Sequence, residues 1–106
     1  MSTPTNQLQH AEQSANVLKT IAHPLRLSII ELLSRPGVAP KRVSDIVKEL
    51  AQPQAIISQH LIHLKDRGVL ASTKTGTSIF YRPALEGLDI IVQAVVVLTM
   101  RKLDVR

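Results

Sequence analysis

The stretch from residue 51 to 69, AQPQAIISQHLIHLKDRGV, limits the folds open to this chain more than any other. Pro53 suits the first turn of a helix, because its fixed φ matches the helix and its missing N–H would have no partner there. Gly68 suits the position just beyond a last helical turn. Three apolar residues recur between them at helical spacing: Ile57, Leu61 and Leu64. The stretch therefore predicts an amphipathic helix with one buried stripe.

The preceding segment makes this helix the second of a pair. Pro40 is expected to open a helix that ends at Leu50. Apolar residues follow Pro40 in the i, i+3, i+4, i+7 pattern of a helix face: Val43, Ile46, Val47 and Leu50. Residues 51–52 leave only a short turn before Pro53. Two helices joined by a turn, the second with a polar outward face, are typical of a helix-turn-helix.

After Gly68 the hydrophobic period changes from that of a helix to that of a strand. Residues 70–74 and 79–82 each alternate in polarity, and the loop 75–77 between them contains Gly76. This pattern predicts a β-hairpin that Pro83 closes. A hairpin directly after a DNA-recognition helix forms the element known as a wing.

Two more helices are expected before the pair and one after the hairpin. The first covers residues 7–20, and the second starts at Pro24 and ends at residues 35–37, Arg-Pro-Gly. The last covers residues 84–102. A strand for residues 94–98, AVVVL, is the competing interpretation, but residues 85–103 keep helical spacing throughout.

The expected fold class is mainly α with a small β-hairpin: a winged helix-turn-helix in the order α-α-α-α-β-β-α. Residues 1–106 are expected to form a single DNA-binding domain whose first six residues fray. Residues 7–22 and 84–103 are interpreted as dimerisation helices, because the last one is apolar nearly all round and a monomer of this size cannot bury it. The expected dimer contacts are Leu8, Ala15, Leu88, Ile91, Val92, Val95 and Leu98.

Composition restricts the partners. Thirteen Lys and Arg against eight Asp and Glu give a net charge of +5, which favours an acidic partner, with nucleic acid as the first candidate. The alternative is an ordinary basic surface that serves solubility alone. The chain has no cysteine, so disulfides and thiolate metal sites are excluded. The N-terminus lacks the features of a signal peptide, and the apolar run 90–100 is too short to span a bilayer. A cytoplasmic protein without membrane contact is expected.

Candidate DNA contacts lie on the outward face of the recognition helix and on the hairpin. Ser and Gln side chains can bond to base edges, and Lys, Arg and Thr side chains can bond to phosphates. The predicted contacts are Gln54, Ala55, Ser58, Gln59, His60, Lys65, Lys74, Thr75, Thr77 and Arg82, with Lys41, Arg42 and Ser78 as further phosphate candidates. The alternative for each is a solvated polar side chain. His60 could instead pack against the third helix, and His23 is expected to cap the second.

Four segments resemble the ArsR/SmtB family of winged-helix repressors: LKTIAHPLRLSIIELL (18–33), VSDIVKEL (43–50), QPQAIISQHLIHLKDRGVL (52–70) and KTGTSIFYRP (74–83). They occur in the family's order over roughly residues 15–85. The resemblance implies a homodimer built from the first and last helices. It also implies repression at a palindromic double-stranded operator and release of the operator by an inducer.

The family's metal sites are incomplete in this chain. The run 42–45, Arg-Val-Ser-Asp, occupies the place of the family's Cys-containing motif and keeps only the Asp. A second family site on the last helix would need ligands after Asp89, but Ile91 holds the next position and no His follows. Neither a metal nor another cofactor is therefore expected, and a small-molecule inducer is the possible ligand.

Two other function classes remain. A metal sensor could use His60 and His63, spaced as His-x-x-His, with carboxylates from elsewhere. A winged-helix module could serve mainly protein association through its apolar last helix. An enzyme is not expected, and no catalytic residue is assigned, because the chain has no Gly-rich phosphate loop and no nucleophile motif.

Overall fold

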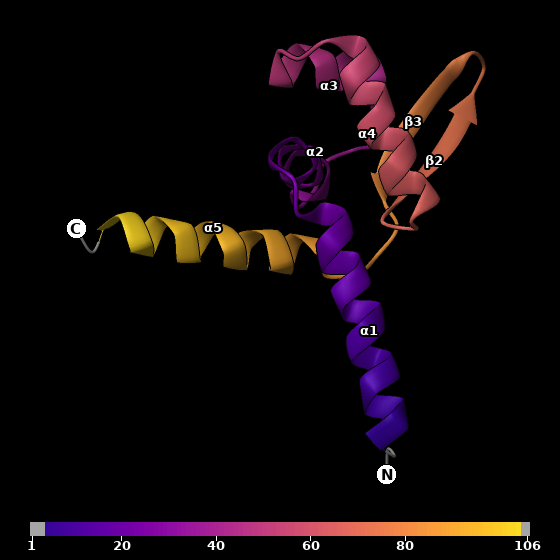
Figure 1. Cartoon of the computed structure of the whole chain (residues 1–106). Helices are drawn as coiled ribbons and strands as arrows, with labels where there is room; N and C mark the ends of the chain where they lie inside the picture. The colour runs from indigo at the N-terminus through magenta and orange to yellow at the C-terminus, as the bar shows by residue number, and fades with distance from the viewer. Residues whose placement is uncertain (1–3, 105–106) are drawn as a thin grey trace.

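The computed structural model describes the backbone of residues 4–104 and the side chains of residues 6–100. Within that part, five helices and three strands follow one another (Figure 1). They are α1 (Pro4–Ile21), α2 (Pro24–Ser34), β1 (Lys41–Arg42), α3 (Val43–Leu50), α4 (Gln54–Asp66), β2 (Leu70–Thr75), β3 (Ser78–Pro83) and α5 (Leu88–Asp104). The winged helix-turn-helix that the sequence predicts is thus present, with one strand more than expected.

The core lies where α2, α3, α4, the base of the hairpin and the start of α5 meet. The predicted stripe of α4 is confirmed, since Ile57, Leu61 and Leu64 are all fully buried. On α2 the buried residues are Ile29, Ile30, Leu32 and Leu33. Leu25, at the start of α2, is only half-buried.

The additional strand β1 corrects the prediction of a helix from Pro40. Lys41 pairs with Tyr81 and Arg42 with Phe80, so β1 joins the hairpin in an antiparallel sheet of order β1-β3-β2. The helix α3 begins only at Val43. A two-residue strand carries no periodicity of its own, and its hydrogen bonds go to residues almost forty positions away, so local patterning could not predict it.

The outer helices also differ from their predicted bounds. Helix α1 begins at Pro4 rather than at residue 7, and residues 1–3 of the segment expected to fray lie outside the described residues. Helix α5 begins at Leu88 rather than at Ala84, because Gly87 adopts φ +85° and its carbonyl accepts the first backbone bonds, from Ile90 and Ile91. The strand interpretation of residues 94–98 is wrong, since they are helical.

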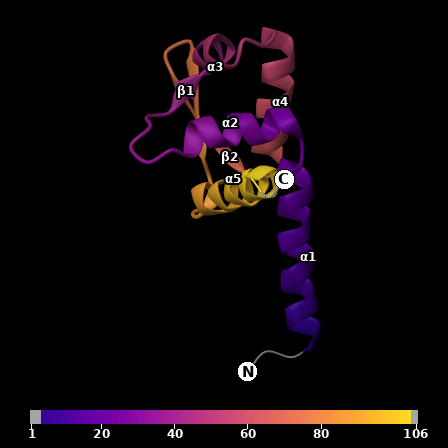
Figure 2. The ribbon, with the colours of Figure 1, turned by 90° about the vertical axis from the view of Figure 1, so that its left-hand side faces the viewer.

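Helices α1 and α5 leave the body of the protein in different directions (Figures 1 and 2). Helix α1 is anchored through its last turn, where Thr20 and Ile21 are buried, whereas its side chains from 6 to 16 are exposed. Helix α5 lies against α2 through Leu88 and Val92 and exposes most of its later residues. Among the described helices, none combines the length and hydropathy that a bilayer span requires.

Candidate nucleic-acid interface

The turn before α4 sets the direction of that helix. Ala51 adopts the left-handed conformation, φ 53°, and its N–H donates to the Val47 carbonyl at 2.9 Å, which closes α3. Pro53 then caps α4, and its carbonyl accepts from the N–H groups of Ile56 and Ile57, each at 3.1 Å. Pro53 is therefore the cap rather than the first helical residue, a shift of one position from the prediction.

The face of α4 opposite its buried stripe is open to solvent. Gln54, Ala55 and Gln59 are exposed, and Ser58 is half-buried. Ile62 and Lys65 continue the same face toward the C-terminal end, where both are exposed. This face offers amide and hydroxyl groups at its N-terminal half and a cation at its end, a combination that can bind base edges and a phosphate.

The hairpin separates the predicted wing residues into two faces. Lys74 pairs with Ile79, and it shares a face with the buried Leu70 and Tyr81 because opposed residues of a ladder point the same way. Thr75 and Arg82 lie on the other face, where the Arg82 guanidinium donates to the Thr73 hydroxyl at 2.6 Å. The structure therefore does not bring Thr75 and Arg82 together with Lys74.

A cleft joins the recognition helix to the tip of the hairpin. Its volume is about 310 Å³. It is lined by Arg42, Val43 and Ser44 at the start of α3, Gln54 at the start of α4, and Thr77, Ser78 and Ile79 at the hairpin. Hydroxyl, amide and guanidinium donors thus converge from three elements. Ser44 was not among the predicted contacts, because its place depends on the late start of α3.

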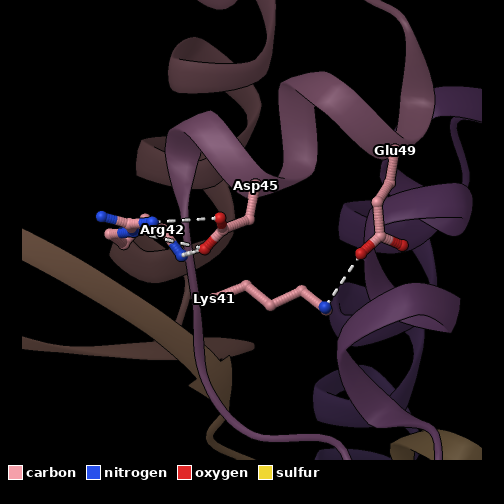
Figure 3. A network of polar contacts seen from close by, with 4 residues as sticks. All are labelled: Lys41, Arg42, Asp45 and Glu49. Atoms are coloured by element: carbon pink, nitrogen blue, oxygen red, sulfur yellow. Dashed lines mark hydrogen bonds and ion pairs between the residues drawn. The ribbon is translucent and has the colours of Figure 1, made fainter.

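Two ion pairs fix the start of α3 (Figure 3). Lys41 Nζ lies 2.9 Å from Glu49 Oε1, and the Arg42 guanidinium lies 3.4 Å from Asp45 Oδ1. The Arg42 backbone N–H also donates to Asp45 Oδ2 at 3.0 Å, and this bond, aided by the guanidinium, lowers the pKa of Asp45. Lys41 of β1 is thus engaged by Glu49 of α3, whereas the Arg42 side chain also lines the cleft.

The His60 side chain points toward α2 and does not belong to the outward face of α4. Its Nδ1 accepts from Arg26 Nε at 3.2 Å, and its ring lies 4.6 Å from that of His23. Burial lowers the pKa of His60, and the nearby His23, Arg26 and His63 lower it further. The structure thus places His60 against α2 instead of the third helix, and its contact with phosphate stays a prediction. His23 caps α2 as predicted, since its Nδ1 accepts from the Leu25 N–H at 3.1 Å.

The predicted dimer contacts divide into two groups. Leu8, Val95 and Leu98 are 61%, 40% and 68% exposed, and Ala15 is exposed as well. Leu88 and Val92, in contrast, are 2% and 3% exposed because they pack into the core of their own chain, and Ile91 is half-buried against it. Leu88 and Val92 are therefore not available to a partner. The prediction missed this because α5 is apolar on both its inner and outer faces.

The residues of a possible metal site are not gathered. Within the described part of the chain, no group of three His, Cys, Asp or Glu side chains is arranged to hold an ion. His60 and His63 share α4, but His60 is held by Arg26. Burial lowers the pKa of His63, with Arg26 and Arg67 adding to the effect and Asp66 opposing it.

The fold and this surface define a class. A helix-turn-helix whose second helix exposes a polar face beside a basic hairpin is the arrangement of a winged-helix DNA-binding protein.

Comparison with known proteins narrows the class. Residues 23–72 match the pattern of the bacterial regulatory proteins of the arsR family. The transcriptional repressor PagR of Bacillus anthracis is 36% identical over 80 residues, which are 73% of this chain and 78% of PagR. The chain therefore belongs to the ArsR family of DNA-binding transcriptional regulators, a family of regulators and not of enzymes.

Solved structures agree with this assignment. A predicted DNA-binding transcriptional regulator from E. coli superposes with a TM-score of 0.80 at 26% identity, over 91% of this chain and 99% of that one. A homodimeric winged helix-turn-helix domain from Mycobacterium bovis gives 0.75 at 26% identity, over 100% and 94% of the two chains.

Proposed function

We propose that this protein is a sequence-specific transcriptional repressor that binds a palindromic operator as a homodimer. The observation that carries the proposal is the exposed polar face of α4 beside the cleft that it shares with the hairpin. The net charge of +5 agrees with a polyanionic partner. Repression is the activity that the names of PagR and of the SmtB repressor of Mycobacterium tuberculosis give to those relatives.

The roles of the side chains follow from their positions. Gln54, Ser58 and Gln59 would read base edges in the major groove, and Ala55 would contact a thymine methyl. Lys74 and Thr77 at the hairpin, with Lys65 at the end of α4, would hold the phosphate backbone. Arg42 and Ser44 would add phosphate contacts from the cleft.

The homodimer is proposed from the exposed apolar surface of α1 and α5. The large exposed apolar side chains on these helices are Leu8, Leu18, Ile90, Val95, Val97, Leu98 and Met100. A monomer rarely leaves so many large apolar side chains exposed on two helices, and a second copy of the same chain would cover them. The Mycobacterium bovis relative, which is homodimeric, supports this arrangement.

Release of the operator is proposed to follow the binding of a small molecule and not of a thiol-bound metal, since the chain has no cysteine.

We expect the protein to act in the cytoplasm, where its operator DNA lies.

The proposal is tested by fluorescence anisotropy with duplexes from the promoter of the protein's own gene and with unrelated duplexes of equal length. We expect two chains per promoter duplex and an affinity at least about a thousandfold higher than for unrelated DNA at the same salt concentration. Equal affinity for both duplexes would contradict sequence-specific binding.

A further inference from the structure

A polar seam lies between α1 and the C-terminal end of α4. It consists of two adjoining pockets, of about 180 Å³ and about 460 Å³. Both pockets are lined by Asn16, Thr20 and Arg67. The smaller pocket, named the inner pocket because it lies between Lys19 and His63, adds these two residues, and the larger one, named the outer pocket, adds Gln13, Val17 and Asp66.

The inner pocket is positively charged and contains no carboxylate. Lys19 and Arg67 line it, and within the described residues neither has an ion-pair partner. A third cation lies close by, because the Arg26 guanidinium donates to the Thr20 carbonyl at 3.1 Å. Burial is the main cause of the lowered pKa of His63, and the charges of Arg26 and Arg67 lower it further while that of Asp66 raises it.

We propose that the inner pocket binds a small oxoanion of the phosphate or carboxylate class. The Arg67 guanidinium can donate two parallel hydrogen bonds to such a group, and the Lys19 ammonium and the Asn16 amide can donate to its remaining oxygens. A volume of about 180 Å³ suits a small ion and excludes a nucleotide. The one carboxylate nearby, Asp66, lines only the larger pocket, and Lys19, Arg67 and Arg26 outnumber it around the site.

From its position between two helices, a bound anion would regulate operator affinity. This part of the proposal rests on the proposed function. Asn16 and Lys19 belong to α1, whereas His63 and Arg67 belong to the end of the recognition helix. Since α1 is otherwise anchored only through its last turn, an anion that bridges the two helices would fix their relative direction. Because α1 carries part of the proposed dimer surface, the ion would change the separation of the two recognition helices and thereby operator affinity.

Binding is measured on the full chain without DNA, by NMR titration with inorganic phosphate and separately with acetate at constant ionic strength. We expect saturable shifts of the His63 ring signals with at least one of the two anions, while the His10 signals stay unchanged. The two arms distinguish a phosphate site from a carboxylate site. Shifts that rise linearly without saturation for both anions would overturn the proposal.

Variants locate the site. Lys19→Gln and Arg67→Gln each remove one charge and should weaken binding about tenfold or more. Lys48→Gln removes an equal charge from the exposed face of α3 and should leave binding unchanged. An equal loss in all three variants would show general charge attraction and contradict a built site. Thermal unfolding of each variant verifies that it is folded.

The regulatory effect is measured separately, as operator affinity with and without the bound anion. An affinity that the anion does not change would contradict the coupling while the site itself stands. If the wild-type protein binds no operator at all, the proposed function is contradicted, whatever the NMR titration shows.

Discussion

At the scale of single residues, the bond from Arg26 to His60 is a polar contact that joins the recognition helix to α2, beside the apolar packing of its buried stripe. Arg26 Nε donates to His60 Nδ1 at 3.2 Å, and the same guanidinium donates to the Thr20 carbonyl at 3.1 Å. One side chain of α2 therefore holds both the end of α1 and the middle of α4. Because Nδ1 must accept, the bond requires His60 to be neutral.

This bond makes stability depend on pH. The pKa of His60 is lowered from 6.5 by burial and by neighbouring positive groups, so the unfolded chain binds more protons than the folded one near neutral pH. The contribution is complete above pH 6.5, declines as the pH falls through 6.5, and levels off below the lowered pKa of the folded state. The lowered pKa of His63 acts with the same sign.

His60→Asn should flatten this dependence. The Asn Oδ1 can still accept from Arg26 but does not titrate, so the decrease in unfolding free energy between pH 7.5 and 5.5 should be smaller in the variant than in wild type. Urea unfolding at several pH values measures it, with His10→Asn on the exposed part of α1 as the control. A variant with the full wild-type slope would show that His60 is not the responsible group.

At the scale of elements, the hairpin and the recognition helix contribute in different ways. Lys74 is exposed near the tip of β2, where it would meet the phosphate backbone and no base. Helix α4, in contrast, presents amides and a hydroxyl that can distinguish bases.

Lys74→Ala should therefore weaken binding to every duplex alike. We expect the slope of log affinity against log salt to fall in magnitude by about one, because one fewer counterion is released. Anisotropy at several salt concentrations measures the slope, with Lys48→Ala on α3 as a comparison. A loss confined to the operator, with an unchanged slope, would contradict a phosphate contact.

Some features of these elements could be predicted from the sequence alone, and others could not. The stripe of Ile57, Leu61 and Leu64 could be predicted because helical spacing is a local signal. The strand β1 could not, because its partners Phe80 and Tyr81 are distant in sequence. The direction of His60 could not be predicted either, since it depends on where Arg26 of another helix lies.

At the scale of the whole molecule, the exposed apolar side chains of α1 and α5 are the surface that we propose a second chain covers. Val95 is 40% exposed on α5, close to the half-buried Val96 that packs on the core. A carboxylate at position 95 would stay hydrated in a monomer, but burying it in an apolar interface would cost free energy because it would lose that hydration.

Val95→Asp should therefore dissociate the dimer while the chain stays folded. Wild type should sediment at twice 11.7 kDa at micromolar concentration, and the variant at the mass of one chain. Gln93→Asp, on an exposed polar position of the same helix, is the matched control. A wild-type protein that sediments as a single chain would refute the homodimer.

The inducer belongs to the same scale. Zinc, cadmium, arsenite and a persulfide donor, each added at a stoichiometric, low-micromolar level, should leave the operator complex intact, because thiolate ligands are lacking. Release by any one of them that a change of His60 or His63 abolishes would instead identify a histidine-based metal sensor.

Selecting bound sequences from a random duplex library shows whether the outward face of α4 reads a symmetric operator. Wild type should enrich a two-fold symmetric motif with half-sites about 10–10.5 bp apart, or a multiple of that distance. Gln59→Ala should enrich the same motif with preference reduced at one base pair per half-site, by about 1–3 kcal/mol. No enriched motif with wild type, or an identical motif at full preference with Gln59→Ala, would contradict this role of α4.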